Sequence, residues 1–190
     1  MSFNFRIFVT KLTMSRIVLT GPPGAGKTSV IEKIESKGYN IVPEPARTLI
    51  EHYKIHSPEL LPAVSKESRK LFQLAIEETT IKDFKSNLTG FFDRSILDEI
   101  GYRNRYDIAI SPELDKAART HRYNHIFIFP FWEEIYKNDS VRHETAEEAK
   151  IVAEFIHQAY VMYGYTPIIV PKMDVDKRVD FILENIWHLL

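Results

Sequence analysis

Eight consecutive residues near the amino terminus, Gly21 to Thr28, constrain the fold of this chain more than any other feature. They read Gly-Pro-Pro-Gly-Ala-Gly-Lys-Thr and match the pattern Gly-x4-Gly-Lys-Ser/Thr. The glycines let the backbone curl so that successive N–H groups point at phosphate oxygens, and a following helix adds its positive N-terminal dipole. Because this geometry needs a strand before the loop and a helix after it, the segment predicts an α/β domain.

The same loop predicts a ligand. Lys27 is expected to reach the β- and γ-phosphates of ATP or GTP, and the hydroxyl of Thr28 is expected to bind Mg²⁺. An ordinary Gly-Pro turn is the alternative, but a β-like run precedes the match and a helical pattern follows it. The residues expected to contact the nucleotide are Gly21, Pro22, Pro23, Gly24, Ala25, Gly26, Lys27, Thr28 and Ser29.

Around this loop, short β-like runs alternate with longer helical patterns, as in a parallel sheet covered by helices. The predicted strands are 16–20, which is central, 40–44, 89–93, 125–129 and 166–170. The predicted helices are 27–36, 46–53, 66–85, 95–105, one starting at 112, 145–163 and 174–190, with a loop over 54–65. We expect a three-layer α/β domain, with about five parallel strands, helices on both faces and ligands at the carboxyl ends of the strands.

The helix predicted over 66–85 rests on a stripe of residues at near-helical spacing. The stripe consists of Leu71, Leu74, Ala75, Glu78 and Ile81.

Composition limits the classes of protein. The chain has 190 residues, a net charge of −1 and no cysteine. The length suits one domain, and the missing basic excess argues against a dedicated nucleic-acid binder. Without cysteine there is neither a disulfide framework nor a thiolate metal site, which fits a reducing compartment, so we expect a cytoplasmic protein. Composition does not indicate an oligomeric state.

No apolar run is long enough to cross a bilayer, so no transmembrane segment is predicted. Residues 1–13 contain Arg6 and Lys11 but no acid, as in a weak targeting peptide. Because their apolar stretch is short and no small-residue cleavage site follows, we favour an N-terminal extension, or an upstream start with Met14 as the usual one. Residues 14–190 are then expected to form the single domain.

Two acids end predicted strands beside the loop. Asp93 closes Gly-Phe-Phe-Asp, the expected layout of a second carboxylate for Mg²⁺, and Arg94 after it could grip a phosphate or a substrate acid. Alternatively, Asp93 caps the next helix. Glu44 lies between two prolines and could accept a proton from a substrate hydroxyl. Equally, Glu44 could be an acidic helix start paired with Arg47.

For the other charged residues, the sequence suggests a functional role only at Arg142. Arg142 precedes a long predicted helix, so it could sit on a lid that closes over the triphosphate, although a solvated charged loop is the alternative. Histidine spacing suggests no metal site. Four further arginines are expected to be surface charges: Arg103, Arg105, Arg119 and Arg122.

These motifs resemble a known group, the AAA-type ATPase/kinase family. It includes the ribosylnicotinamide kinase domain of the bacterial NAD-biosynthesis regulator, and an insect protein implicated in TRP-channel translocation is similar. The resemblance covers most of the chain and rests on residues 19–28, 42–47, 92–98, 129–145 and 163–167. It implies a P-loop fold like that of nucleoside and nucleotide kinases.

A weaker resemblance is to deoxyribonucleoside kinases, through Glu44-Pro45 and Asp93-Arg94-Ser95. It implies that Glu44 is the base on the sugar hydroxyl and that Arg94 contacts phosphate or substrate. Asp93 stands where that family has Glu, and Arg142 is the clearest match to its arginine-rich lid. The nucleoside-binding residues of that family have no recognisable match.

Two functions follow as hypotheses. The first is a small-molecule kinase that transfers the γ-phosphate of ATP, with Mg²⁺, to an unidentified nucleoside- or nucleotide-like acceptor; Lys27, Glu44, Asp93, Arg94 and Arg142 carry the chemistry. The second, motivated by the insect resemblance, is a regulatory ATPase or GTPase switch that binds a protein or lipid partner. The chain lacks the Asn-Lys-x-Asp guanine signature, which favours ATP, while GTP stays possible.

Overall fold

Five parallel strands form one sheet in the computed structural model, which describes residues 15–136 and 145–188. The strands are β1 (Arg16–Thr20), β2 (Ile41–Val42), β3 (Gly90–Asp93), β4 (His125–Ile128) and β5 (Ile168–Ile169), in the order β2-β3-β1-β4-β5. β1 is therefore central, as the sequence predicts. Its apolar, β-branched residues are fully buried because helices cover both faces of a parallel sheet.

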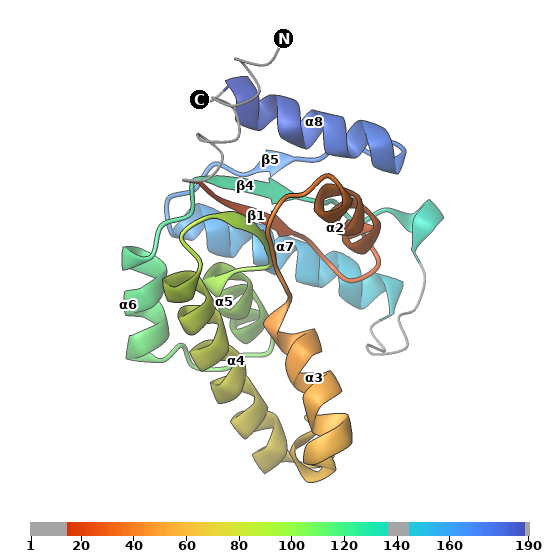
Figure 1. Cartoon of the computed structure of the whole chain (residues 1–190). Coiled ribbons are helices and arrows are strands. Elements are labelled where there is room, and N and C mark those ends of the chain that lie inside the picture. Colours follow the sequence, from red (N-terminus) through yellow and green to blue (C-terminus); the bar gives the residue numbers. More distant parts are fainter. Residues whose placement is uncertain (1–14, 137–144, 189–190) are drawn as a thin grey trace.

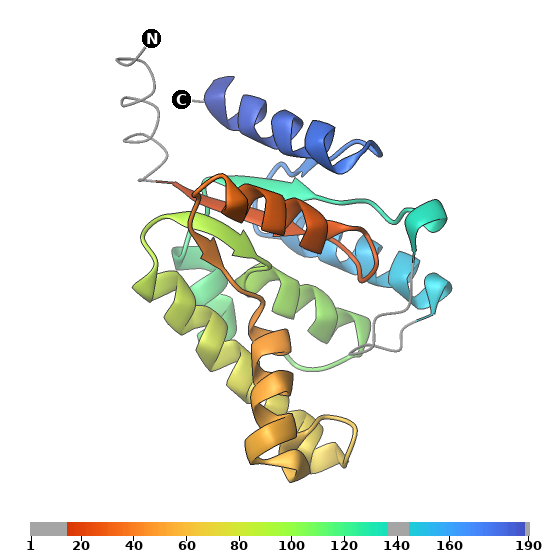
Figure 2. The same ribbon diagram turned by 45° about the vertical axis from the view of Figure 1, so that its right-hand side comes forward.

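Helices cover both faces, which confirms the predicted three-layer α/β architecture (Figures 1 and 2). On one face, α2 (Lys27–Ser36) and α8 (Val175–His188) pack against Ile17 and Leu19. On the other face, α5 (Ile96–Arg105) and α7 (Ala146–Met162) pack against Val18. Successive side chains of a strand point to opposite faces, so one strand supplies both cores. The other helices of the described residues are α3 (Pro45–His56), α4 (Lys66–Ser86) and α6 (Pro112–Thr120), with the 3-10 turns η1 (Pro58–Leu60) and η2 (Glu133–Ile135).

α3 and α4 form a pair that extends away from the sheet and is joined at its far end (Figures 1 and 2). α3 begins beside the sheet, with Pro45 at its first turn. α4 begins at the far end, where the Ser65 hydroxyl accepts from the backbone N–H of Ser68 and the Ser68 hydroxyl reaches back to the N–H of Ser65. This capping box holds the first turn of α4 in place.

Two expectations about elements are wrong. The edge strands β2 and β5 have two residues each, because an edge strand pairs on one side only and Pro43 lies just past β2. The predicted loop over 54–65 is partly helical, since α3 continues to His56 and η1 follows. The helix predicted over 66–85 is confirmed as α4, in which Leu71 and Leu74 are 52% and 43% exposed.

The buried face of α4 instead carries Phe72, Thr80 and Phe84. Two adjacent stripes on this helix mix apolar and polar residues, so helical spacing alone does not select the buried one. None of the helices in the described part of the chain is long and apolar enough to span a membrane. Residues 1–13 and Arg142 lie outside the described residues.

Candidate functional site

The glycine-rich loop connects the end of β1 to the start of α2, as its sequence predicts. Gly21, Gly24 and Gly26 have φ of 139°, 71° and 75°, a region that other L-residues rarely adopt. A Cβ on Gly21 would lie 2.2 Å from the carbonyl oxygen of Phe129 on the neighbouring segment. Glycine is therefore required both for the turn and for the close approach of β4.

Lys27 lies across this loop. Its Nζ donates to the carbonyl oxygens of Gly21 and Pro22, at 3.0 and 2.9 Å, and its side chain is buried. Thr28 and Ser29 are exposed on the first turn of α2. The loop thus presents an ammonium, hydroxyls and a helix N-terminus together, which is a donor set suited to phosphate.

Asp93 ends β3 beside the same loop, because Asp93 is paired in register with Leu19 of β1. Its Oδ1 is buried and has no hydrogen-bond partner among the described residues. Burial raises the pKa of the Asp93 carboxyl, and the positive charges of Lys27 and Arg94 oppose that shift. A buried carboxylate oxygen without a donor is suited to a cation ligand, which fits the predicted magnesium side of the loop.

Arg94 follows directly and turns toward Glu44. Its φ of 73° is unusual for a residue other than glycine and aims its side chain into the space beside β2. Its Nε donates to Glu44 Oε1 at 2.7 Å and its Nη1 to Asp98 Oδ1 at 3.1 Å. Burial would lower the pKa of Arg94, but the acidic groups of Tyr102, Asp98 and Asp93 outweigh it, so the net shift is upward.

Sequence reasoning gave Asp98 no role, yet it is the centre of the buried hydrogen bonds. Besides Arg94, its carboxylate accepts from the Thr20 hydroxyl, from the Ser95 N–H at 2.9 Å and from the Tyr160 hydroxyl at 2.6 Å. Thr20 immediately precedes the glycine-rich loop. The Ser95-x-x-Asp98 capping box was a visible signal, but it predicts only a helix start.

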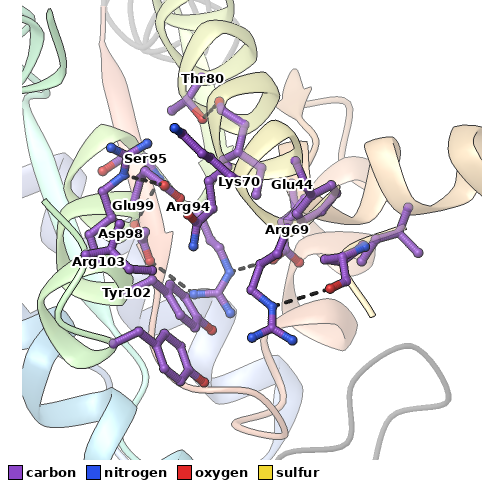
Figure 3. A pocket seen from close by; sticks show the side chains of 18 of the residues that line it. Glu44, Arg69, Lys70, Thr80, Arg94, Ser95, Asp98, Glu99, Tyr102 and Arg103 are labelled. Atoms are coloured by element: carbon purple, nitrogen blue, oxygen red, sulfur yellow. Dashed lines mark hydrogen bonds and ion pairs between the residues drawn. The ribbon is translucent and has the colours of Figure 1, made fainter. Parts of the chain in front are cut away.

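A pocket of about 730 Å³ opens beside Glu44 and Arg94, between α3, α4 and α5 (Figure 3). Its volume lies within the usual range for small-molecule sites. Asp93 and the glycine-rich loop do not line it. Its lining consists of Glu44, Ala46, Ile50, Pro62, Lys66, Arg69, Lys70, Phe72, Gln73, Ile76, Thr80, Arg94, Ser95, Asp98, Glu99, Tyr102, Arg103, Tyr106 and Ile108.

Arg103, predicted as a surface charge, is buried in the wall of this pocket, which corrects that expectation. Its guanidinium donates to Glu99 Oε1 and Glu77 Oε2, both at 2.8 Å, and to the Ala109 carbonyl. Burial raises the pKa of Glu99 to about 7, although its hydrogen bond and ion pair with Arg103 act in the opposite direction. The four-residue spacing of Glu99 and Arg103 could have suggested this pair.

Two more arginines are placed beside the site. Arg47 Nε lies 3.9 Å from Glu44 Oε2, as expected if Arg47 helps to hold Glu44. Arg178 of α8, which sequence reasoning missed, is buried with Nη1 3.4 Å from the Ala25 and Gly26 carbonyls of the loop. The described residues contain no cluster of three His, Cys, Asp or Glu side chains that could hold a metal by themselves.

Comparison with known proteins identifies the family and the fold. A family model described as an AAA domain matches residues 16–178. No curated protein matches the chain. Deoxyadenosine kinase from M. mycoides, solved with the products dCMP and a flexible dCDP, is similar with a TM-score of 0.67 and 16% identity, covering 92% of this chain and 100% of that one.

Two further solved structures share the fold. The same deoxyadenosine kinase with bound dATP has a TM-score of 0.63 at 15% identity, covering 90% of this chain and 98% of that one. The NadR protein in complex with NAD and AMP-PNP has a TM-score of 0.63 at 13% identity, covering 96% of this chain and 51% of that one. At these identities the likeness shows a common fold, in agreement with both resemblances found in the sequence.

Proposed function

The chain belongs to the AAA-domain family of P-loop proteins, and from that premise we propose that it is a kinase that transfers the γ-phosphate of ATP to a hydroxyl of a small, nucleoside-like molecule. The observation that carries this proposal is the pocket beside the Glu44–Arg94 pair, at the carboxyl edge of the sheet where the glycine-rich loop also lies. A nucleotide switch needs no such cavity. A phosphotransferase needs a second site for its acceptor.

Glu44 is the group in this pocket suited to activate a hydroxyl. It lies two residues past β2, at the N-cap position of α3 just before Pro45, and its side chain is 5% exposed. The Arg94 guanidinium stabilises the carboxylate form through a charge-assisted hydrogen bond. In the proposed step, Glu44 takes the proton of the acceptor hydroxyl as the hydroxyl oxygen attacks the γ-phosphorus. The bond to the β-phosphate oxygen breaks, which leaves ADP and the phosphorylated acceptor.

The donor side is assigned to the glycine-rich loop. Its N–H groups and Lys27 would hold the phosphates, with Lys27 exchanging its bonds to Gly21 and Pro22 for phosphate oxygens. Arg94 and the predicted lid residue Arg142 would then neutralise charge that develops on the transferring group.

Mg²⁺ fits the residues present. Thr28 offers an exposed hydroxyl and Asp93 a buried oxygen without a donor among the described residues, which are the hard oxygen ligands this ion prefers. When bound, the ion would supply charge neutralisation of the phosphates.

A transfer assay tests the proposal. The full chain is incubated with γ-labelled ATP and Mg²⁺ together with a panel of nucleosides, and labelled acceptors are separated from free phosphate. A labelled acceptor is the expected result. Slow hydrolysis with no labelled acceptor, capture of a protein or lipid only in the nucleotide-bound state, or a preference for GTP would instead support the regulatory switch.

A further inference from the structure

One face of α4 lines the pocket over most of its length. The lining residues on this face recur at intervals of three and four, so they form one stripe. From first to last they span about 21 Å at 1.5 Å per residue, which is longer than a nucleoside. The stripe consists of Lys66, Arg69, Lys70, Gln73, Ile76 and Thr80.

Charge is distributed unevenly along the pocket that this stripe lines. At the inner end, Arg94 is paired with Glu44 and Asp98, and Arg103 with Glu77 and Glu99. Each buried cation there is balanced by two carboxylates.

The outer end is different. Lys66, Arg69 and Lys70 are exposed, and none of them lies within ion-pair distance of a carboxylate in residues 15–136 and 145–188. The Nε of Arg69 donates to the Pro62 carbonyl, at 3.4 Å. The N-terminus of α4 adds its positive dipole at the same place. Positive charge therefore remains uncompensated at the end of the pocket farthest from the sheet.

Apolar side chains line the wall between the two ends, including Ile50, Phe72 and Ile76. Figure 3 shows Arg69 and Lys70 from α4 near the same cavity as Glu44 and Arg94. Given the proposed kinase function, we propose that the acceptor is elongated and carries an anionic group, a carboxylate or a phosphate, at the end opposite the hydroxyl that receives phosphate. A neutral nucleoside would leave the three outer cations without a partner.

We expect the three outer cations to increase the selectivity of the pocket for anionic ligands more than its affinity for them. Exposed ion pairs contribute little individually and are screened by salt. Three like charges beside an apolar wall nevertheless raise the local concentration of anions and disfavour cationic competitors. The preference for an anionic ligand should therefore be strong at low salt and weak at high salt.

Two matched dyes test the charge of the pocket without any assumption about catalysis. 1-Anilinonaphthalene-8-sulfonate is an elongated apolar anion, and N-phenyl-1-naphthylamine is the same scaffold without the sulfonate. Fluorescence titrations compare the wild-type chain, the double variant Lys66→Gln/Lys70→Gln, and the control Lys82→Gln. Lys82 is exposed on the same helix but does not line the pocket.

We expect the sulfonate to bind the wild type and the control equally, and more tightly than the neutral dye. We expect the double variant to bind it about tenfold more weakly, with the neutral dye unchanged. Equal binding of the two dyes, no binding of either, or a double variant that binds the sulfonate as the wild type does would each overturn the inference. Circular dichroism confirms that both variants are folded.

A second measurement separates this inference from the proposed function. Phosphate transfer is assayed with nucleoside carboxylic acids and the corresponding carboxamides as paired acceptors. A preference for acids that is lost in Lys66→Gln/Lys70→Gln supports both ideas. Transfer that favours the carboxamides refutes the anionic acceptor but leaves the kinase in place. Charge-selective dye binding without any transfer refutes the kinase but leaves the anion-selective pocket.

Discussion

The Nε of Arg94 donates to Oε1 of Glu44 over 2.7 Å, although the two residues are 50 positions apart in the chain and both are buried. The pair joins the segments that directly follow two adjacent strands, β2 and β3. Neither side chain is free to move away without leaving a buried charge, and such a loss is costly. The position of the proposed base is therefore set by the sheet itself.

Glu44→Gln tests that base. The substitution keeps the shape and can still accept from Arg94, but the amide cannot take a proton. If Glu44 is the base, kcat of phosphate transfer should fall about 10²–10⁴-fold with KM for ATP nearly unchanged. Glu51→Gln, at an exposed site on α3, is the control. Unchanged kcat in Glu44→Gln would show that the base assignment is wrong.

Asp93→Asn tests the magnesium side. Removing a buried charge that lacks a donor should not lower the stability of the nucleotide-free protein. It should, however, abolish the extra stabilisation that Mg²⁺ adds to ATP binding. If Mg²⁺ tightens ATP binding about 100-fold, this extra stabilisation at saturating ATP is about 2.7 kcal/mol. Thermal unfolding with ATP, with and without Mg²⁺, measures both effects. Asp180→Asn, exposed on α8, should keep the full Mg²⁺ response.

Tyr160→Phe tests the buried hydrogen bonds around Asp98. The variant removes the hydroxyl that lies 2.6 Å from both Asp98 Oδ2 and Ser95 Oγ, and leaves the packing of the ring intact. We expect a loss of about 1–3 kcal/mol in the free energy of unfolding, because a buried acceptor loses its donor. Urea denaturation gives the value, and Tyr39→Phe at a half-buried site is the comparison. An equal loss in both variants would contradict the special role of the Asp98 contacts.

Stability should depend on the pH through Glu99. Its pKa is about 7 in the folded protein against an ordinary value of 4.5. Between these values the folded chain keeps a proton that the unfolded chain has released, so the free energy of unfolding decreases as the pH rises. The total decrease is about 3 kcal/mol.

The variant Glu99→Gln isolates this contribution. Subtracting its pH profile from that of the wild type should leave a decline across about pH 5 to 7 and a plateau above it. A flat difference would show that Glu99 does not titrate in this range.

Gly101→Ala tests the close packing of α5 against α7. A Cβ there would lie 2.9 Å from the Cα of Ile156, which is backbone and cannot yield easily. We expect a loss of about 1–3 kcal/mol from overpacking, in spite of the better helix propensity of alanine. Gly38→Ala is a comparison in which only the backbone is strained, because its φ is +88° and nothing lies within 4 Å of the added Cβ. Calorimetry measures both losses, and an unchanged or increased stability of Gly101→Ala would contradict the close packing of α5 against α7.

Local patterns were enough to predict much of the fold. The glycine-rich loop, β1, α2 and the capped starts of α5 and α7 depend on residues within a few positions of one another, so their spacing is visible in the chain. Alternation of strands and helices then implied a parallel sheet, and a parallel sheet brings Asp93, Glu44 and the loop to one edge. The AAA-family resemblance is confirmed for the same reason, since its motifs are local.

Tertiary packing decided what local patterns could not. Burial of Arg103, exposure of Leu71 and Leu74, and the four donors on Asp98 depend on which helix faces are brought together, by residues up to 78 positions apart. The pocket exists only because α3 and α4 fold back on each other beside α5. The sequence by itself therefore determined a phosphate-binding loop in an α/β domain, because loop geometry is a property of neighbouring residues. Only the tertiary structure decided the shape and charge of the second site, because a cavity is formed by surfaces that are distant along the chain.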